Sequence, residues 1–226
     1  MIDINRALKH VEEAHFVRGL AWGEVGDYDQ ALADIDRAIE LNPNVADYYL
    51  GRARFHLGEA RDVRALSDYE RAAELNPADT VAPMNAGAIW FGRNIWTRAI
   101  QCFDRVVEID PANAQAHYSR YLAYSRQGNG AQALSCIDRA LELAPAERQF
   151  LVSRALLHFR ARRFGQAIPD FSRLVELDPA DASWLYARGV ARIRLGDIVG
   201  GRADLAEAAA IEPGIAGSMA KEGIVP

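Results

Sequence analysis

The stretch Ala31–Pro43, ALADIDRAIELNP, decides the fold of this 226-residue chain. Its apolar residues recur at intervals of three and four, so they share one face of a helix. Pro43 follows the last of them, and proline ends a helix because it lacks a backbone donor and clashes with the preceding turn. The stretch therefore predicts an amphipathic helix that stops at Pro43.

The same pattern returns five more times at a constant spacing of 34 residues, without insertion or deletion. A fixed period of about 20–50 residues is typical of stacked supersecondary units. The six copies are ALADIDRAIELNP (31–43), ALSDYERAAELNP (65–77), AIQCFDRVVEIDP (99–111), ALSCIDRALELAP (133–145), AIPDFSRLVELDP (167–179) and GRADLAEAAAIEP (201–213).

Each unit contains a second, earlier helical segment. We expect these first helices at about residues 12–25, 46–59, 80–93, 114–127, 148–161 and 182–195. A small residue recurs at one place in them, where it would let the paired helices approach closely; Tyr121 is the exception. The residues at this place are Gly19, Ala53, Gly87, Tyr121, Ala155 and Gly189.

Charged residues also follow the period. Asp34, Arg37 and Glu40 are spaced by three, so we expect opposite charges to meet on the solvent face of the second helix. The two cysteines, Cys102 and Cys136, occupy the place of Asp34 in their units and are expected to be outward-facing, inert thiols. A row of arginines in the first helices predicts a shared structural role, such as bonds to a neighbouring helix. Its members are Arg18, Arg52, Arg120, Arg154 and Arg188, with Ala86 in the third unit.

The chain resembles the tetratricopeptide repeat family. The resemblance rests on the period, on the two-helix unit and on residues at the family's signature sites. In the first unit these are Gly19, Trp22, Ala31, Ile35, Ala38 and Pro43, and in the third they are Gly87, Trp90, Ala99, Phe103 and Pro111. It implies an all-α fold, an α-solenoid in which six helix–turn–helix repeats form a right-handed superhelix.

We expect the following division of the chain. Residues 1–11 extend the first helix, residues 12–215 form the repeats, and residues 216–226 are a short C-terminal tail that partly caps the last repeat. The six repeats are 12–45, 46–79, 80–113, 114–147, 148–181 and 182–215.

Composition narrows the class of function. The net charge of −5 argues against nucleic acid as a partner, and no apolar run approaches the roughly 18 residues of a membrane span. Residues 1–113 carry 12 basic and 19 acidic side chains, whereas residues 114–226 carry 14 and 12. Two cysteines make no disulfide framework, and the first residues lack an apolar signal core. A cytoplasmic location fits best.

The sequence offers no constellation for chemistry. His10 and His15 are five residues apart, whereas a helical zinc motif needs two histidines four apart. The histidines are better explained as partly buried helix residues. We therefore expect no catalytic residue, no metal, no cofactor and no enzymatic activity.

The resemblance implies that a partner binds along the concave surface, which the first helix of each repeat lines. One row there is Phe16, Leu50, Met84, Tyr118, Val152 and Tyr186; the next is Leu20, Arg54, Ala88, Leu122, Leu156 and Val190; a third includes Leu57, Phe91, Ser125 and Phe159. The expected groove residues are Phe16, Leu20, Leu50, Arg54, Leu57, Met84, Phe91, Tyr118, Leu122, Phe159 and Tyr186. The open alternative is that some of these side chains pack against their neighbours and narrow the groove.

Arg126, Arg160 and Arg194 stand 34 residues apart and predict a basic rim beside the groove, helped by Arg162, Arg163 and Arg192. Arginine suits carboxylates, so the partner segment is expected to be apolar with acidic residues near this end. Solvated surface charges are the alternative interpretation.

Taken together, the patterns favour a protein-interaction scaffold or adaptor that holds a peptide or a helix in a mostly apolar groove. The alternative is a self-assembling structural protein that forms homo-oligomers through its open ends or its groove.

Overall fold

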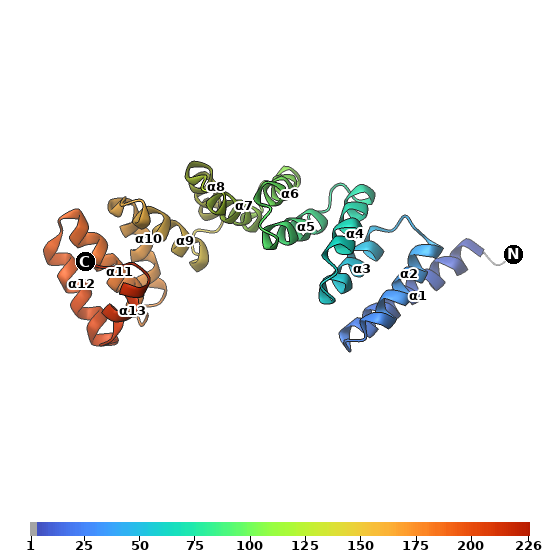
Figure 1. The fold of residues 1–226 in the computed structure, drawn as a ribbon, viewed down its shortest axis with the longest axis horizontal. Coiled ribbons are helices and arrows are strands. Elements are labelled where there is room, and N and C mark those ends of the chain that lie inside the picture. Colours follow the sequence, from blue (N-terminus) through green and yellow to red (C-terminus); the bar gives the residue numbers. More distant parts are fainter. Residues whose placement is uncertain (1–3) are drawn as a thin grey trace. The chain divides into compact units, whose positions relative to one another are not determined.

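A computed structural model describes the backbone of residues 4–226 and the side chains of residues 11–226 (Figure 1). Over residues 4–226 the chain is all-α, with thirteen helices and no strand. The helices are α1 (Ile4–Glu24), α2 (Tyr28–Leu41), α3 (Ala46–Gly58), α4 (Asp62–Leu75), α5 (Val81–Gly92), α6 (Trp96–Ile109), α7 (Ala114–Arg126), α8 (Gly130–Leu143), α9 (Arg148–Arg160), α10 (Phe164–Leu177), α11 (Ala182–Leu195), α12 (Ile198–Ile211) and α13 (Ile215–Lys221).

Consecutive helices pack as pairs, from α1 with α2 to α11 with α12. The short connections make the partners of each pair antiparallel. Five of the six expected first helices agree with the structure to within one residue at each end. The helix α1 begins earlier, at Ile4, as the expected N-terminal extension requires; Ile2 lies outside the described residues.

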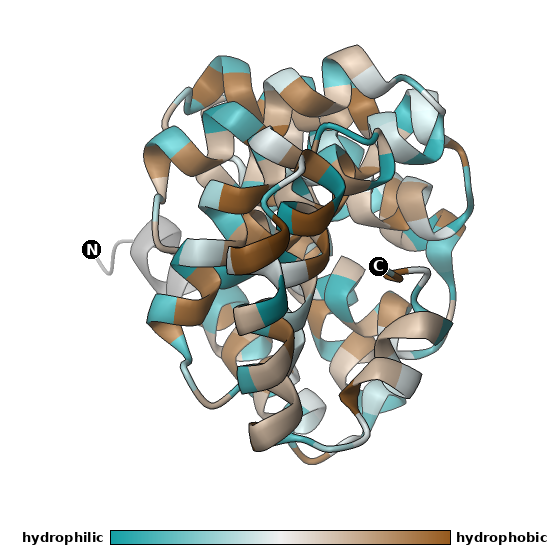
Figure 2. Cartoon of the chain, turned by 90° about the vertical axis from the view of Figure 1, so that its left-hand side faces the viewer, coloured by the Kyte–Doolittle hydropathy of each residue, from teal (hydrophilic) through white to brown (hydrophobic). Residues whose placement is uncertain are grey.

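The chain divides into two compact units, residues 1–112 and residues 113–226, and each is described by itself. In the first unit, buried apolar side chains form one cluster around Ile35 and another around Tyr69. In the second unit a single cluster around Phe171 runs from α7 to residues beyond α13. The helices carry apolar and hydrophilic residues side by side (Figure 2), as expected when one face of each helix is buried.

The recurring small residue brings the two helices of a pair together, as predicted. A Cβ added to Gly87 would lie 2.5 Å from the ring of Phe103. In the last repeat a Cβ on Gly201 would lie 2.6 Å from the carbonyl oxygen of Gly189, a backbone atom that cannot turn aside as a side chain can. Gly201 therefore replaces the alanine of other repeats because α11 and α12 leave no room for a methyl group.

Each first helix ends in the same turn. The residue two positions after the helix, or directly after it in the case of α11, has a positive φ. The next amide donates a backward hydrogen bond to the carbonyl five residues earlier, such as Asp27 N to Trp22 O at 3.0 Å. This is a Schellman motif, which satisfies carbonyls that the helix end leaves without partners. The residues with positive φ are Gly26, Ala60, Asn94, Gly128, Arg162 and Gly196.

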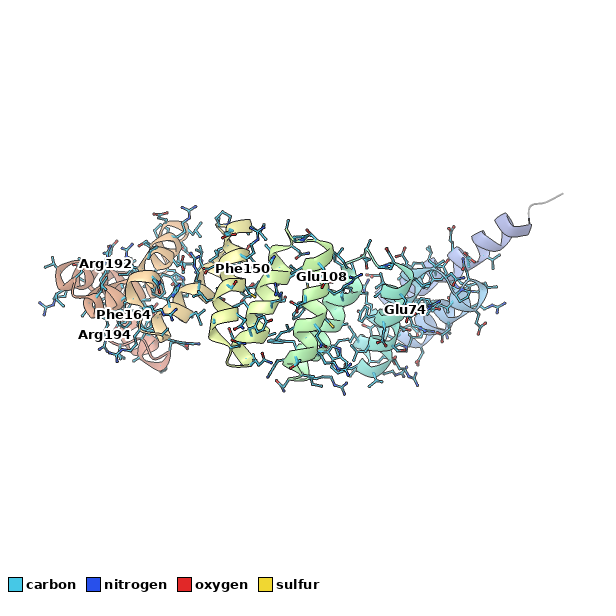
Figure 3. All side chains as sticks on the ribbon, turned by 90° about the horizontal axis from the view of Figure 1, so that it is seen from above. Glu74, Glu108, Phe150, Phe164, Arg192 and Arg194 are labelled. Carbon is cyan, nitrogen blue, oxygen red and sulfur yellow. The ribbon has the colours of Figure 1, made fainter. Side chains whose placement is uncertain are left out.

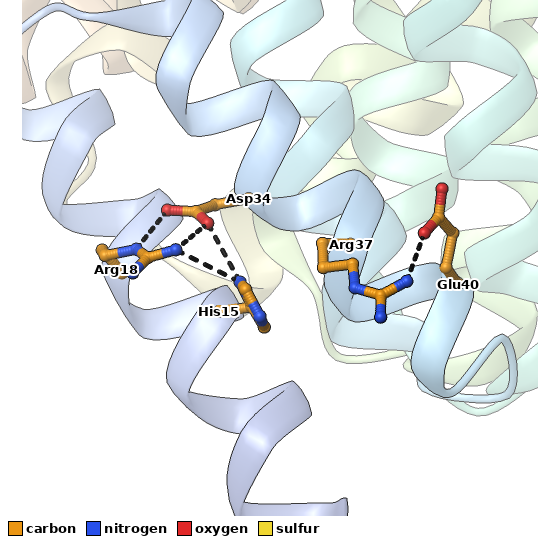
Figure 4. A network of polar contacts seen from close by, with 5 residues as sticks. All are labelled: His15, Arg18, Asp34, Arg37 and Glu40. Atoms are coloured by element: carbon orange, nitrogen blue, oxygen red, sulfur yellow. Dashed lines mark hydrogen bonds and ion pairs between the residues drawn. The ribbon is translucent and has the colours of Figure 1, made fainter.

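An arginine of the first helix binds an aspartate of the second within four of the repeats. Arg18 donates to both carboxylate oxygens of Asp34, with Nε–Oδ2 and Nη2–Oδ1 distances of 2.6 Å (Figure 4). The other three pairs, all bidentate, are Arg52–Asp68, Arg154–Asp170 and Arg188–Asp204. The prediction that this arginine row is structural is confirmed in these repeats.

The expectation for Asp34 is wrong. Asp34 is 8% exposed and its equivalents Asp68, Asp170 and Asp204 are 3–4% exposed, because each lies against the first helix of its own repeat. Cys136, at the same place, is buried rather than outward-facing, and Cys102 is half-buried. Only Arg37 and Glu40 meet on the solvent face, at 2.7 Å, and the same surface pair recurs up to Arg173 and Glu176.

The C-terminal tail covers α11, as expected of a partial cap. The helix α13 packs against α11 and α12, and more extensively against α11. Ile215, Met219 and Ile224 are buried in the apolar cluster that also contains Tyr186 and Val190 of α11.

Candidate functional site

Most of the predicted groove residues are half-buried. The exceptions are Arg54, which is exposed, and Tyr118 and Tyr186, which are buried. Phe16, Leu20, Leu50, Leu57, Met84, Phe91, Leu122 and Phe159 are half-buried, and Arg54 is exposed. Phe91 packs edge-on against Trp96, with 5.0 Å between the ring centroids, and Phe159 packs in the same way against Phe164 at 5.3 Å. Each ring thus presents only part of its surface to a partner.

The prediction that Tyr118 lines the groove is wrong. It is 4% exposed, and its ring stacks on Phe150 of α9 with 4.7 Å between centroids. Its hydroxyl lies 3.2 Å from the hydroxyl of Ser153. The next first helix therefore covers Tyr118, which supports the neighbouring surface from below and is not itself available to a partner.

The prediction that Tyr186 lines the groove is also wrong. It is 6% exposed because α13 packs over α11. Val190, one turn further along α11, is fully buried in the same way, although its counterpart Leu156 on α9 is half-buried. The tail therefore closes this face of the last repeat.

A cavity of about 340 Å³ opens between α7 and α9 in the second unit. It combines apolar walls from α9 with hydroxyl groups and one guanidinium group. Its lining residues are Tyr121, Ser125, Gly128, Gly130, Val152, Ser153, Leu156, Leu157 and Arg160. Concave sites with mostly apolar walls and a few polar groups are typical of ligand-binding sites.

Sequence reasoning missed the part that Tyr121 plays in this site. Tyr121 departs from the small residues found at its place in the other repeats, and its hydroxyl donates to the carbonyl of Ser153 at 3.5 Å. The ring therefore leans from α7 towards α9 and forms one wall of the cavity. The departure from the repeat pattern was the available signal.

The basic rim is only partly as expected. Arg126, Arg160 and Arg194 are all exposed, and no acidic side chain in the described part of the chain pairs with Arg126 or Arg160. Arg194 donates to the carbonyl oxygen of Val225 at 3.3 Å. Arg192 projects away from Arg194 on α11 (Figure 3) and binds Asp204 at 2.9 Å, so it does not help the rim.

Arg54, in the first unit, differs from these rim arginines. Its Nη2 atom lies 2.9 Å from a carboxylate oxygen of Glu24, so its charge is already compensated within the chain. Arg162 and Arg163 are exposed like Arg126 and Arg160, and none of these four pairs with an acidic side chain in the described part of the chain, so they carry the positive charge that the predicted rim offers to a partner.

A second cavity of about 340 Å³, which sequence reasoning did not anticipate, lies in the first unit among α4, α5 and α6. It occurs where the third repeat has Ala86 and Cys102 in place of the arginine and aspartate. Trp90 lines it, with the guanidinium carbon of Arg98 5.1 Å from the centre of the indole. The simultaneous loss of both charged residues was the sequence signal for this space.

Burial moves several titratable groups towards their neutral forms. It lowers the pKa of His56 and of His158, and it raises the pKa of the Cys102 thiol. Asp34 is shifted towards its charged form instead, because hydrogen bonds from Arg18 lower the pKa of its carboxyl to about 2. These shifts follow from the packing of each repeat, and the residues concerned share no common site.

Known sequences and structures agree with the repeat architecture. A tetratricopeptide repeat model matches residues 12–45, and a second model of the same repeat matches residues 64–114, 91–148, 118–168 and 152–214. The chain belongs to the tetratricopeptide repeat family. No curated protein matches this tetratricopeptide repeat chain significantly.

Solved structures show the same fold at low sequence identity. The C-terminal part of a repeat protein from Cytophaga hutchinsonii is 18% identical with a TM-score of 0.77, over 89% of this chain and 84% of that one. PilF of Pseudomonas aeruginosa is 18% identical with a TM-score of 0.68, over 95% and 99% of the two chains. YrrB, described as a repeat protein with an unusual peptide-binding site, is 22% identical with a TM-score of 0.67, over 79% and 92%.

No helix within residues 4–226 combines the length and apolar character that crossing a membrane requires.

Proposed function

We propose that this chain is a protein-interaction scaffold or adaptor that binds a peptide or helix along the surface lined by its first helices. Membership of the tetratricopeptide repeat family supports a protein-interaction role in general. The single observation that carries the finer proposal is the cavity between α7 and α9, which has apolar walls and an exposed arginine, Arg160, at its edge.

The charge of this surface favours a segment with an acidic residue beside an apolar one. Arg126 follows the cavity residue Ser125 directly, and like Arg160 it has no acidic partner in the described chain. An apolar side chain would fill the space between Tyr121 of α7 and the α9 residues Val152 and Leu156, and a carboxylate nearby would pair with the guanidinium groups. The arginines then contribute orientation and association rate, and the buried apolar contact contributes most of the affinity.

Affinity capture with the full chain and two variants tests this proposal. Leu156→Asp places a charge in the cavity, and Arg173→Glu is the control, since Arg173 pairs with Glu176 on the surface of α10. A partner that is retained by the wild type and by the control but lost with Leu156→Asp is the expected result. Identical captures with all three chains would rule out the cavity as the binding site.

Self-association remains the second proposal, because apolar side chains are exposed at one end of the first unit. On α1, Val17 is 64% exposed and Trp22 is 38% exposed, and Val25, directly after the helix, is 74% exposed. A second copy that covered this face would remove them from water. Measuring the molecular mass in solution across a wide concentration range tests self-association. A monomer at high concentration would refute this alternative, and a dimer that Trp22→Glu abolishes would support it.

A further inference from the structure

The cavity among α4, α5 and α6, here called the α4–α6 cavity, lies where the second repeat holds two large side chains. In that repeat Arg52 and Tyr49 pack together, with the guanidinium carbon of Arg52 5.5 Å from the centre of the Tyr49 ring. Thirty-four residues later in the chain, Ala86 stands at the place of Arg52 and Pro83 at the place of Tyr49. Both of these smaller residues line the cavity. The cavity is therefore the space that the two smaller side chains leave open.

The contacts of the second repeat show that the two places correspond. Arg52 binds Asp68 and Asp36, and the guanidinium carbon of Arg71 lies 6.0 Å from the centre of the Tyr49 ring. The three residues that contact Arg52 or Tyr49 in this way have counterparts one period later, and all of these counterparts line the α4–α6 cavity. The counterparts of Asp36, Asp68 and Arg71 are Glu70, Cys102 and Arg105.

The walls of the cavity are largely apolar, and its charged side chains are exposed. Its buried or half-buried walls include Leu66, Tyr69, Ala82, Pro83, Ala86 and Trp90. The charged lining residues Glu70, Arg98 and Arg105 are all exposed. A charged group inside the cavity would lose its hydration without a buried counter-charge, which is unfavourable. The occupant that fits this space is therefore uncharged.

The arginines at the cavity favour an aromatic occupant over an aliphatic one. A guanidinium group is attracted to the face of an aromatic ring. Arg98 already shows this preference, because its guanidinium carbon lies 5.1 Å from the centre of the Trp90 indole. A ring that takes the place of Tyr49 would meet Arg105 as Tyr49 meets Arg71, and it would also lie beside the indole, with which aromatic rings pack favourably.

The ion pair that Arg105 makes does not prevent this contact. Nη1 of Arg105 donates to Glu108 at 3.2 Å. In the second repeat Nη1 of Arg71 donates to Glu74 at 2.8 Å in the same way, and Arg71 still contacts the Tyr49 ring. A guanidinium group in this pair thus keeps a face that a ring can approach.

We propose that the α4–α6 cavity is a second partner site, which binds one aromatic side chain of a protein partner. Aromatic residues that fill a pocket supply much of the affinity of many interfaces. The cavity is lined by the second helices α4 and α6 together with α5, whereas the surface proposed above is lined by first helices. The inference therefore does not depend on that function.

Three small-molecule probes test this inference on the ¹⁵N-labelled full chain by NMR. p-Cresol represents the side chain of tyrosine, 4-methylcyclohexanol is its saturated analogue, and n-butylguanidinium represents the side chain of arginine. With p-cresol we expect saturable shifts at the Trp90 indole and at the amides of Ala86 and Cys102. The other two probes should bind at least fivefold more weakly, because one lacks the aromatic ring and the other brings a charge.

Two variants that fill the cavity provide the controls. Ala86→Leu fills it with an aliphatic group, and Ala86→Arg/Cys102→Asp rebuilds the charged pair of the second repeat. Each should weaken p-cresol binding at least tenfold, whereas Ala78→Leu, the same kind of change at an exposed residue of the first unit, should leave it unchanged. Circular dichroism checks that the variants are folded, and either filled variant is sufficient for the test.

Four results would overturn the inference. The first is the absence of saturable shifts at these residues with millimolar p-cresol, and the second is unchanged p-cresol binding when the cavity is filled. Equal affinity for 4-methylcyclohexanol would show a merely apolar space, and equal or tighter binding of n-butylguanidinium would show a site for a cation. None of these results affects the Leu156→Asp capture experiment, which tests a cavity in the second unit.

Discussion

Arg52 holds the buried carboxylate of Asp68 with two hydrogen bonds, Nε to Oδ2 at 3.0 Å and Nη2 to Oδ1 at 2.6 Å. Its third nitrogen, Nη1, donates to Asp36 of the preceding repeat at 2.7 Å. The same arrangement recurs at Arg154, with Asp170 and Asp138. One arginine thus joins the two helices of its own repeat and the second helix of the repeat before it.

Arg52→Met should destabilise the chain strongly, because it leaves Asp68 charged, buried and without its partner. Removing one member of a buried ion pair costs about 3–5 kcal/mol. The matched control is Arg37→Met, which breaks the exposed pair with Glu40 and should cost about 1 kcal/mol or less. Urea unfolding followed by circular dichroism measures both, and equal losses for the two variants would refute the structural role of Arg52.

The third repeat can be given the missing pair. Cys102→Asp alone should destabilise, because it buries a charge beside Ala86. Adding Ala86→Arg should recover much of the loss, with a favourable coupling of about 1–3 kcal/mol between the two changes. A double-mutant cycle of unfolding free energies measures this coupling. Strictly additive effects would show that the pair does not form in this repeat.

The positive φ in the turns after the first helices predicts how glycine and alanine there affect stability. Ala60 has a φ of 56°, a conformation that costs little for glycine and about 1 kcal/mol for residues with a Cβ. Ala60→Gly should therefore stabilise the chain by about 0.5–1 kcal/mol, and Gly128→Ala, with a φ of 81° at the equivalent turn, should destabilise it by a similar amount. Changes of the same sign in the two variants would contradict the assignment of the turn.

Stability should fall in two steps as the pH is lowered. Burial lowers the pKa of His56 and of His158 in the folded chain, so their contribution is complete above the unfolded value of about 6.5 and is lost below it. Asp34, with a folded pKa of about 2, loses its contribution only as the pH falls from about 4 towards 2. Urea midpoints from pH 7.5 to 3 check this.

A control separates these two steps. The double variant His56→Gln/His158→Gln should remove most of the loss between pH 6.5 and 5 and keep the loss at lower pH. A midpoint in the wild type that does not change between pH 7.5 and 5 would contradict the role given to the two histidines.

The fold could be predicted from the sequence because its determinants are local and repeated. Pro43 and its successors end the second helices, and the apolar intervals around Ile35 define the buried face, so neither inference needs a distant contact. Asp34 was misplaced because its partner, Arg18, lies 16 residues earlier on another helix. The joint recurrence of the two residues, and their joint loss at Ala86 and Cys102, carried that information.

The candidate site was harder to predict because side chains outside the periodic pattern decide which parts of the groove stay open. Tyr186 is buried on α11, against which the C-terminal helix α13 packs, and the repeat does not encode this contact. Tyr118 is covered because the next repeat places a large ring, Phe150, directly over it. The cavity itself depends on Tyr121, the one bulky residue at a small-residue position.

The central claim is that a partner segment binds at the α7–α9 cavity and beside Arg126 and Arg160. The most direct measurement is the dissociation constant of one captured partner segment at 50 and 200 mM salt. This constant is measured for the wild type, for the double variant Arg126→Glu/Arg160→Glu and for the charge-matched control Arg139→Glu/Arg173→Glu. The control alters two exposed ion pairs, one on α8 and one on α10. We predict a loss of about tenfold or more in the first variant, larger at low salt, and almost none in the control. Equal affinity of all three proteins at both salt concentrations would contradict the claim.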